Sequence, residues 1–469
     1  MTTPSPKRIG LEHTEAGTPQ IGGTVSWSHP RSRGREFRDI HYWMEMAKLL
    51  DAADFDFLFF AGGSFGYSTF KGELSTALLR GGFTFGIDGS YIIPALAAVT
   101  EKLGFVVTST TGADHPMHTV RKFATLDAVT NGRIGWNIVT GASQNVMAEV
   151  LGMTEMVPHA ERYAAADEYV DLALEYWEGG NEDDVMPMDA ESGVFADAGK
   201  MHKIVHEGTY YRSTGYHTQP PTPQRTPLLF QAGTSDPGRA LAARQAEGVF
   251  VQGTTYERTA EAVADIRAKA AANGRDPQSI KVFVGLTLIT GKDDAEAAQR
   301  RREFEEMQDD EVTAHYYSGN TGVDLSALDP DKTLLEQDYG YEKAGQMGKS
   351  NIERFLGGNG RPAPTVREIL DELRPRGTRG FAITGGPESA ADQIEELIEA
   401  TDLDGIMIEA VFDIASMQDF ITHVQPVLRA RGRLDPAPTG DTFRERMLGA
   451  GPHLADTHHA AEYRPKPRA

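Results

Sequence analysis

Two kinds of apolar segment alternate along most of the chain. Short runs rich in β-branched and aromatic residues predict buried strands, and longer runs with apolar residues every three or four positions predict helices. The predicted strands are 55–60, 105–111, 134–141, 226–235, 249–253, 280–290 and 405–412. The predicted helices are 42–53, 92–104, 117–132, 162–179, 237–248, 259–274 and 391–402. This alternation predicts a parallel sheet with helices outside it.

Residues 108–141 show the pattern most clearly, as two strands joined by an amphipathic helix. Both strands finish in small polar residues, at Thr110 and Thr111 in the first and at Asn137 and Thr140 in the second. By itself this unit is compatible with many α/β folds. In an α/β barrel, polar residues at the carboxyl ends of strands face the ligand-binding site.

Two long regions interrupt the alternation. Residues 180–225 are acidic and rich in Gly and Pro, and we expect a β-hairpin excursion there. Residues 295–375 open with a charged helix and continue with little strand character, which is typical of lids, oligomer contacts or substrate walls. The tail from Arg433 is rich in Pro, Arg and His. We expect a solvated surface arm there rather than a metal site at His453, His458 and His459.

Composition excludes several classes of protein. The 469 residues include 46 basic and 68 acidic ones, and the net charge of -22 argues against nucleic acid or anionic membrane as partners. The absence of cysteine excludes disulfides, thiolate zinc sites and a cysteine nucleophile. We find no secretory signal and no run of roughly 20 apolar residues, so we expect a cytoplasmic protein.

Catalytic motifs of the common hydrolases and transferases are absent: there is no Walker loop, nucleophile elbow or zinc-protease helix. In QAGTSDPG, a strand runs through Gly233, Thr234 and Ser235 into the N-terminus of a helix. Such a turn can hold a phosphate, although a simple helix cap is commoner. In HAERY, His159 and Tyr163 share one helix face and could donate to a phosphate or a polar ring. The alternative is a surface histidine beside an ordinary amphipathic tyrosine.

Trp27 and His29 lie in an early loop, SWSHP, where they could line a pocket or, for Trp27, serve as a hydrophobic plug. Each of these signals is weak alone, but their order along the chain fits the rim of one barrel. Polar strand ends at 61–64, 108–111 and 137–141 precede HAERY and then AGTS. A neutral rim with backbone access through glycines suits a flat, uncharged ring system that carries one phosphate.

Several nearly literal motifs occur in the same order. They are HPMHTVRKFATLDAVTNGRIGWNIVTG, HAERYAAADEYVDLALEYWEG, HEGTYYRSTGYHTQPPTPQRTPLLFQAGTSDPG, GPESAADQIEELIEATDLDGIMI and DFITHVQPVLRARG. Over residues 20–433 the chain resembles the bacterial-luciferase-like flavin monooxygenases. The branch is the one that contains nitrilotriacetate monooxygenase component A, dibenzothiophene sulfone monooxygenase and the pristinamycin synthase large subunit.

The resemblance implies a (β/α)8 TIM barrel over residues 20–433, with insertions near 180–225 and 295–375, an N-terminal extension at 1–19 and a C-terminal tail at 434–469. It also implies a two-component monooxygenase. A separate NAD(P)H:flavin reductase would supply reduced FMN, which reacts with O2 to give a flavin peroxide that oxygenates a small organic substrate. The protein would be a homodimer or homotetramer.

The resemblance also assigns cofactor residues. Thr110 and Asn137 would contact the isoalloxazine ring or ribityl chain, with Val139 and Thr140 beside them. The remaining cofactor residues would be His159 and Tyr163 near the phosphate, Gly233, Thr234 and Ser235 around it, and Ala61 and Gly62 facing the flavin. We expect His29 near the reacting oxygen, with Trp27 as a wall of the pocket.

The chain departs from the family at Gly62, where an acidic residue is usual, and at Gly112 and Ala113, where aromatic residues are common. We expect a wider or differently shaped substrate mouth, and replacing the small residues with the family's larger ones should narrow the substrate range. Two alternatives stay open: a deazaflavin-dependent oxidoreductase of the same superfamily, or a flavin-binding protein without catalysis. The sequence does not identify the substrate.

Overall fold

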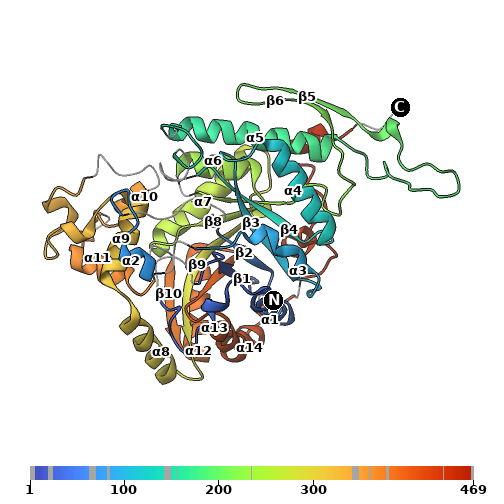
Figure 1. Ribbon diagram of the computed structural model, residues 1–469. Helices are drawn as coiled ribbons and strands as arrows, with labels where there is room; N and C mark the ends of the chain where they lie inside the picture. Colours follow the sequence, from blue (N-terminus) through green and yellow to red (C-terminus); the bar gives the residue numbers. More distant parts are fainter. Residues whose placement is uncertain are drawn as a thin grey trace.

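A closed barrel of eight parallel strands forms the centre of the computed structural model (Figure 1). The structure describes residues 6–19, 25–62, 70–81, 85–141, 149–155, 157–233, 235–340, 348–358, 361–376, 380–436 and 438–465. In barrel order the strands are β1 (Gly10–Glu15), β2 (Phe57–Phe60), β3 (Gly104–Thr110), β4 (Ile134–Val139), β7 (Leu228–Ala232), β8 (Gly248–Val251), β9 (Lys281–Thr290) and β11 (Gly405–Ala410). Pairing of β11 with β1 closes the barrel, so the predicted (β/α)8 fold is confirmed.

A ninth strand, β10 (Phe381–Gly385), lies beside the carboxyl-terminal half of β9. β8 pairs with residues 281–284 of β9, and β10 pairs with residues 286–290 of the same strand. β10 therefore extends the wall of the barrel beyond the end of β8. Sequence analysis predicts no strand at 381–385, because the segment FAITG is short and contains only two large apolar residues.

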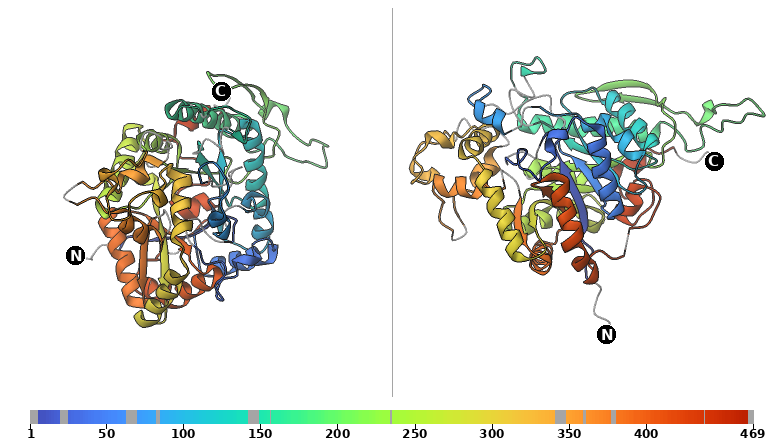
Figure 2. Two further views of the ribbon diagram at one scale, coloured as in Figure 1. Left: turned by 60° about the vertical axis from the view of Figure 1, so that its left-hand side comes forward. Right: turned by 60° about the horizontal axis from the view of Figure 1, so that its bottom comes forward.

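Helices surround the barrel, as Figures 1 and 2 show. Apart from α2 and α15, which are described below, those outside the insertions are α1 (Ile40–Ala52), α3 (Ile93–Ala97), α4 (Pro116–Val129), α5 (His159–Gly179), α6 (Asp236–Gln245), α7 (Tyr256–Ala272), α12 (Pro387–Thr401), α13 (Asp413–Asp419) and α14 (Gln425–Ala430). Within the described residues, no helix is both long and apolar enough to cross a membrane.

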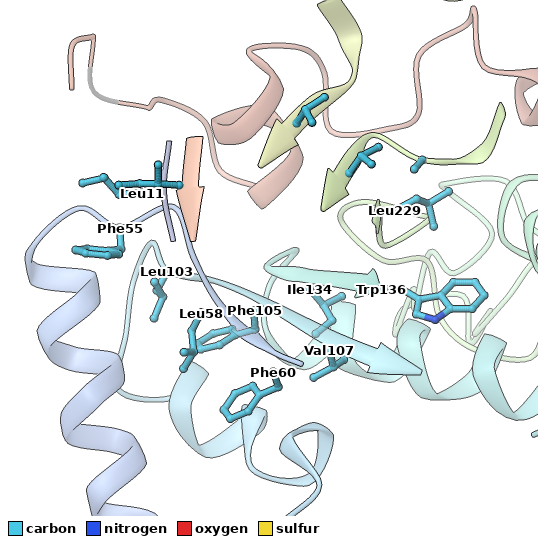
Figure 3. Close-up of a cluster of buried hydrophobic side chains, with 14 of the residues drawn as sticks. Leu11, Phe55, Leu58, Phe60, Leu103, Phe105, Val107, Ile134, Trp136 and Leu229 are labelled. Carbon is cyan, nitrogen blue, oxygen red and sulfur yellow. The ribbon is translucent and has the colours of Figure 1, made fainter. Parts of the chain in front are cut away.

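The main core lies between the strands and this layer of helices. Figure 3 shows side chains of β1 to β4 that point out of the barrel into this core, among them Leu58, Phe105 and Trp136. All three are fully buried. Burial of one such side chain contributes about 1.5–3 kcal/mol. This layer holds the strands in register and so fixes the positions of their ends.

Aromatic rings fill the inside of the barrel. Phe57 and Phe250 each pack 5.2 Å from Phe230, measured between ring centroids. A Cβ atom at Gly248 would lie 2.4 Å from the Phe230 ring, so this position must be glycine. The packed rings block the lumen, and a ligand can reach the barrel only from its ends.

The first barrel strand lies within the segment expected to be an N-terminal extension. β1 has the sequence GLEHTE, and all six of its residues are buried between β11 and β2. Polar side chains occupy most of this strand, so the sequence lacks the apolar run that predicts a buried strand. The burial is possible because His13 pairs with Glu15 at 2.9 Å and with the Ile408 carbonyl at 3.0 Å.

Both interruptions of the alternating pattern form additional structure. Residues 180–225 contain the antiparallel hairpin β5 (Lys203–Glu207) and β6 (Arg212–Tyr216), as expected. The second region contains α8 (Asp294–Met307), α9 (Asp310–Thr321), α10 (Gly348–Glu353) and α11 (Val366–Leu373). Tyr317, Phe355 and Ile369 belong to a separate hydrophobic core there. α9 also packs against α2 (Thr76–Arg80), which lies between β2 and β3 in the sequence.

The C-terminal arm is packed against the barrel, contrary to the expectation of a solvated segment. Phe443 of α15 (Phe443–Leu448) is buried beside Phe57, with 5.4 Å between ring centroids. The imidazole of His458 is buried and meets the Gln245 carbonyl at 3.1 Å. His459 pairs with Asp171 at 2.9 Å. Among the described residues, no group of three or more His, Asp or Glu is placed to hold a metal ion.

Arg444 attaches this arm to the end of the barrel opposite the carboxyl ends of the strands. Its guanidinium is fully buried and donates to both carboxylate oxygens of Glu247, at 2.8 and 3.0 Å. It also donates to the carbonyls of Thr226 and Pro227 at 3.0 and 3.1 Å. Burial alone would lower the pKa of Arg444, but the Glu247 carboxylate more than offsets this and raises it.

Replacement Arg444→Ala should lower the free energy of unfolding by about 3–5 kcal/mol, because it leaves the Glu247 carboxylate buried without its partner. Urea unfolding followed by tryptophan fluorescence would measure the change. Arg367→Ala is the matched control, because the Arg367–Asp331 ion pair is exposed and its loss should leave the unfolding midpoint unchanged. Equal midpoints for wild type and Arg444→Ala would contradict the role of the Arg444–Glu247 pair in attaching the C-terminal segment to the barrel.

Candidate functional site

Most of the predicted cofactor residues lie at the carboxyl ends of four consecutive strands, β2, β3, β4 and β7. We call the residues at or just after the carboxyl ends of the barrel strands the rim. Ala61 and Gly62 follow β2, Thr110 ends β3, Asn137 and Val139 are in β4 with Thr140 after it, and Gly233 follows β7. Thr234 lies outside the described residues. Parallel pairing therefore brings these positions to one side of the rim.

Asn137 points into the barrel with one unused acceptor. The single proton of the Thr108 hydroxyl goes to the Phe60 carbonyl at 3.0 Å, so Thr108 accepts from Nδ2 of Asn137 at 3.0 Å. This fixes the amide orientation and leaves Oδ1 of Asn137 buried, without a hydrogen-bond partner in the described part of the chain. A buried acceptor without a partner is costly, and an N–H donor of a bound ring would satisfy it.

A second part of the predicted site is the N-terminus of α6. Ser235 caps this helix and accepts from the Gly238 amide at 3.2 Å. A Cβ atom at Gly238 would lie 3.1 Å from the Tyr163 hydroxyl, the Ser235 hydroxyl and the Gly233 Cα alike. The chain thus brings Tyr163 and Ser235 together around a space that any side chain at Gly238 would fill. Both hydroxyls are neutral donors at a helix N-terminus, which suits a phosphate.

His159 lies next to Tyr163, with 4.8 Å between their ring centroids. Burial lowers the pKa of His159, and the neighbouring Arg162 lowers it further. The imidazole is therefore neutral near pH 7, and it contributes hydrogen bonds rather than charge. Arg162 donates to the Gly141 carbonyl at 2.7 Å and so attaches the start of α5 to the end of β4.

Gly62 is required by packing. A Cβ atom there would lie 2.3 Å from the carbonyl oxygen of Ala16, which follows β1. The ends of β1 and β2 are also held close together by a hydrogen bond, in which the Ala61 amide donates to the Glu15 carbonyl at 2.7 Å. A residue larger than glycine at position 62 would therefore separate the ends of β1 and β2, in addition to any effect on the substrate range.

Of the predicted catalytic pair, His29 lies at a different part of the rim. The His29 ring stacks on Phe412, just after β11, with 4.3 Å between centroids. Its Nδ1 accepts from the Arg31 amide at 3.2 Å, and its Nε2 lies 4.0 Å from Glu303. Burial lowers the pKa of His29, with Glu303 acting in the opposite direction. Trp27 donates from its indole to the Arg80 carbonyl at 2.8 Å. The contacts of His29 join it to the β11 side of the rim, whereas most of the cofactor residues lie on β2 to β7 and Trp27 contacts the segment between β2 and β3.

The loop of Trp27 and His29 is fixed by a carboxylate that the sequence pattern does not reveal. One carboxylate oxygen of Asp413 accepts from the Arg33 amide at 3.0 Å, the Gly34 amide at 2.8 Å and the Ser32 hydroxyl. Burial raises the pKa of Asp413 to about 7, and Glu15 raises it as well, against the lowering effect of these donors. Asp413 also has a positive φ of 50°. No motif in the sequence marks this residue.

Asp413 should make the stability of the protein depend on pH. Its pKa is raised on folding, so its proton is held more tightly in the folded state than in the unfolded one. The stabilisation is complete below the unfolded pKa and is lost as the pH rises to about 7. Between about pH 5 and about pH 8 the wild type should lose roughly 2–3 kcal/mol more than Asp413→Asn. Urea unfolding at the two pH values would test this, with the exposed Asp456→Asn as control, and parallel pH profiles would contradict it.

Comparison with known proteins shows one family. Residues 20–403 match the profile of the luciferase-like monooxygenases. Dimethyl-sulfide monooxygenase of Hyphomicrobium sulfonivorans is 36% identical over 457 residues, covering 97% of this chain and 92% of the relative. Long-chain alkane monooxygenase of Geobacillus thermodenitrificans is 34% identical over 440 residues, covering 93% and 94%.

Comparison with solved structures gives the same family. A crystal structure of riboflavin lyase, with modified FMN and substrate riboflavin, has a TM-score of 0.89 at 35% identity and covers 98% of this chain and 100% of that one. Dibenzothiophene-sulfone monooxygenase, nitrilotriacetate monooxygenase component A and a pristinamycin IIA synthase are also relatives, which confirms the resemblance seen in the sequence. The chain belongs to the luciferase-like monooxygenase family.

Proposed function

We propose that this protein is the oxygenating component of a two-component flavin-dependent monooxygenase. It would take reduced FMN from a separate NAD(P)H:flavin reductase in the cytoplasm and use O2 to oxygenate a small organic substrate. The monooxygenases among its relatives support the reaction class, and the riboflavin lyase structure with modified FMN supports the cofactor. The observation that carries the proposal is the pairing on one rim of the buried Asn137 acceptor, which has no partner among the described residues, with the space between the Tyr163 and Ser235 hydroxyls at the N-terminus of α6.

These residues fit FMN in two respects. Asn137 offers an acceptor to a ring N–H, and Thr110, at the end of the neighbouring strand, would contact the same ring or the ribityl chain. Tyr163 and Ser235 would donate to the phosphate, together with backbone amides of α6. Val139, Thr140, Ala61 and Gly62 would line the ring, with His159 and Gly233 beside the phosphate. Thr234 would join the phosphate group by its place in the motif.

Reduced FMN, when bound, supplies two electrons to O2, so that one oxygen atom enters the substrate and the other leaves as water. The chain itself positions the substrate and excludes bulk water. Phe412, Phe304 and Ile289 are buried together at the β11 side of the rim and form an apolar wall. We propose His29 as the residue nearest the reacting oxygen, because its neutral imidazole can exchange a hydrogen bond there, with Trp27 as a wall.

Tyr163→Phe should weaken binding of FMN about tenfold or more and leave binding of riboflavin unchanged, because only FMN carries the phosphate that the hydroxyl contacts. Anaerobic fluorescence titration with both reduced flavins would measure the two dissociation constants. Tyr91→Phe, with an exposed side chain, serves as control. An equal loss for both flavins would place the phosphate elsewhere.

Oxygen transfer would test the reaction class. The enzyme, reduced FMN and isotopically labelled O2 would be mixed with dimethyl sulfide, long-chain alkanes, dibenzothiophene sulfone, nitrilotriacetate and riboflavin, the compounds that the names of its relatives suggest. We expect one labelled oxygen atom in the product of at least one compound. Hydride transfer to or from a deazaflavin without oxygen consumption would overturn the proposal. Tight flavin binding without oxygen transfer to any of them would favour the non-catalytic alternative.

A further inference from the structure

Arg354 is buried in the helical insertion without a hydrogen-bond partner. It follows α10, which packs together with α11 against α9 beside the barrel (Figure 1). Only 5% of its side chain is exposed, and all three guanidinium nitrogens are buried with no hydrogen-bond partner among the described residues. A guanidinium in this state is costly, because burial removes its water and nothing replaces the lost hydrogen bonds.

Other buried arginines show how this chain normally satisfies such a group. Arg444 donates to Glu247 and to backbone carbonyls. Arg133 donates to one hydroxyl and two carbonyls at 2.8 to 2.9 Å, and Arg267 donates to two carboxylates at 2.9 and 3.1 Å. Of the arginines within the described ranges, Arg354 is the one whose three nitrogens are all buried without a hydrogen bond. The fold therefore does not supply its partner.

The charges around Arg354 leave an excess of positive charge. A guanidinium nitrogen lies 3.5 Å from Oε1 of Glu372 in α11, without the geometry of a hydrogen bond. The same oxygen pairs closely with Arg376, and the Glu372 side chain is 43% exposed. Burial lowers the pKa of Arg354 to about 10, and Arg376 lowers it further against Glu372, so the group is still cationic at pH 7. Two guanidiniums thus share one carboxylate that is partly in water.

The edge of the Arg354 guanidinium is suited to an oxyanion. The ring of Phe355 covers one face of the guanidinium, 4.4 Å from its central carbon to the ring centroid. Stacking leaves the N–H groups in the plane available, and this planar fork matches the two oxygens of a carboxylate, sulfonate or phosphate. A water molecule can accept one of these hydrogen bonds, but it does not offset the excess charge. An oxyanion does both.

The insertion also holds Arg354 close to the mouth of the barrel. Three residues earlier, the side chain of Asn351 accepts a hydrogen bond from Gln252, which follows β8 on the rim. The Asn351 carbonyl accepts from the Tyr317 hydroxyl at 3.1 Å. α10 is therefore fixed both to the rim and to the core of the insertion, and Arg354 lies about one helical turn from the rim contact.

We propose that Arg354 is the centre of a binding site for a small oxyanion, namely a carboxylate, sulfonate or phosphate group, between α10 and α11. The guanidinium donates two parallel hydrogen bonds to the anion, and Arg376 adds attraction at longer range. The anion is either a free ion or the anionic group of a substrate that enters from the rim. The second source rests on the proposed function, whereas the site itself does not.

Unfolding of the flavin-free protein tests the site. At constant ionic strength, replacing chloride by acetate or sulfate should raise the unfolding midpoint of the wild type, because the oxyanion binds only the folded chain. Sulfate stabilises proteins in general, so the quantity compared is the difference between wild type and variant. Arg354→Met should weaken the apparent dissociation constant of either anion about tenfold or more. Arg354→Lys keeps the charge without the fork and should retain a weakened response.

In chloride alone, Arg354→Met should unfold at the wild-type midpoint or above it. The substitution removes a buried charge and leaves Glu372 paired with Arg376. Arg367→Met is the matched control, because Arg367 belongs to the same insertion but is 60% exposed and pairs with Asp331. It should respond to acetate and sulfate as the wild type does.

Equal responses of wild type and Arg354→Met to both anions would overturn the proposal. A lower midpoint of Arg354→Met in chloride, with no response of the wild type to either anion, would also overturn it, because the guanidinium would then stabilise the fold by itself. A response that survives in Arg354→Met but is lost in Tyr163→Phe would belong to the phosphate space at α6 and would not count for this site.

Turnover separates the two sources of the anion. If the anion is part of the substrate, Arg354→Met should raise the KM of an anionic substrate such as nitrilotriacetate about tenfold or more, with kcat and the KM of dimethyl sulfide unchanged. Unchanged KM values, or oxygenation of uncharged compounds only, together with a lost response to acetate and sulfate, would assign the site to a free ion. Absence of any turnover would contradict the proposed function and leave the site intact, because the unfolding measurements need no reaction.

Discussion

Pairing between β1 and β11 is the contact on which the rest of the molecule depends. These strands are almost 400 residues apart in the sequence, yet Gly10 lies opposite Gly405 and His13 opposite Ile408. Because all strands of the closed sheet are parallel, this one pairing brings every carboxyl end to the same rim. Direct pairing of β1 with β2 also brings the end of β1 close to the end of β2, where the Ala16 carbonyl excludes a side chain at Gly62. The geometry of the rim is a consequence of this closure.

The two sides of the rim are built differently. On β2 to β7, neutral hydroxyl and amide groups come from strand ends and from the start of a helix, so the backbone itself places them. On the β11 side, the loop that carries His29 depends on side-chain contacts, namely the stacking of His29 on Phe412 and the donors gathered around Asp413. The first side is suited to a cofactor of constant shape. The second can vary its side chains without moving the barrel, as a surface that selects substrates must.

Sequence patterns are sufficient for strands and helices with strong periodicity, and insufficient where polar contacts decide the structure. β4 and β9 are predictable because most of their residues are β-branched, aromatic or otherwise apolar. β1 falls in the predicted extension because its burial depends on the His13–Glu15 pair, which no local pattern reveals. α3 ends at Ala97 rather than at residue 104, because Asp51 accepts from the amides of residues 101–103 and stops the helix. The site follows the same rule: strand-end residues can be placed from motifs, whereas Asp413 acts through three donors from a distant loop.

The closure of the barrel also has a consequence for how the chain is made. β1 leaves the ribosome first, but neither its partner β11 nor Phe443, which seals the aromatic interior, exists until nearly the whole chain has been synthesised. During that interval the edge of β1 that later pairs with β11 and the inward aromatic rings stay uncovered, and such surfaces associate readily with other chains. The nascent chain is therefore vulnerable until residues 405–443 have been made, and chaperones that protect nascent chains should affect its yield more than its final stability.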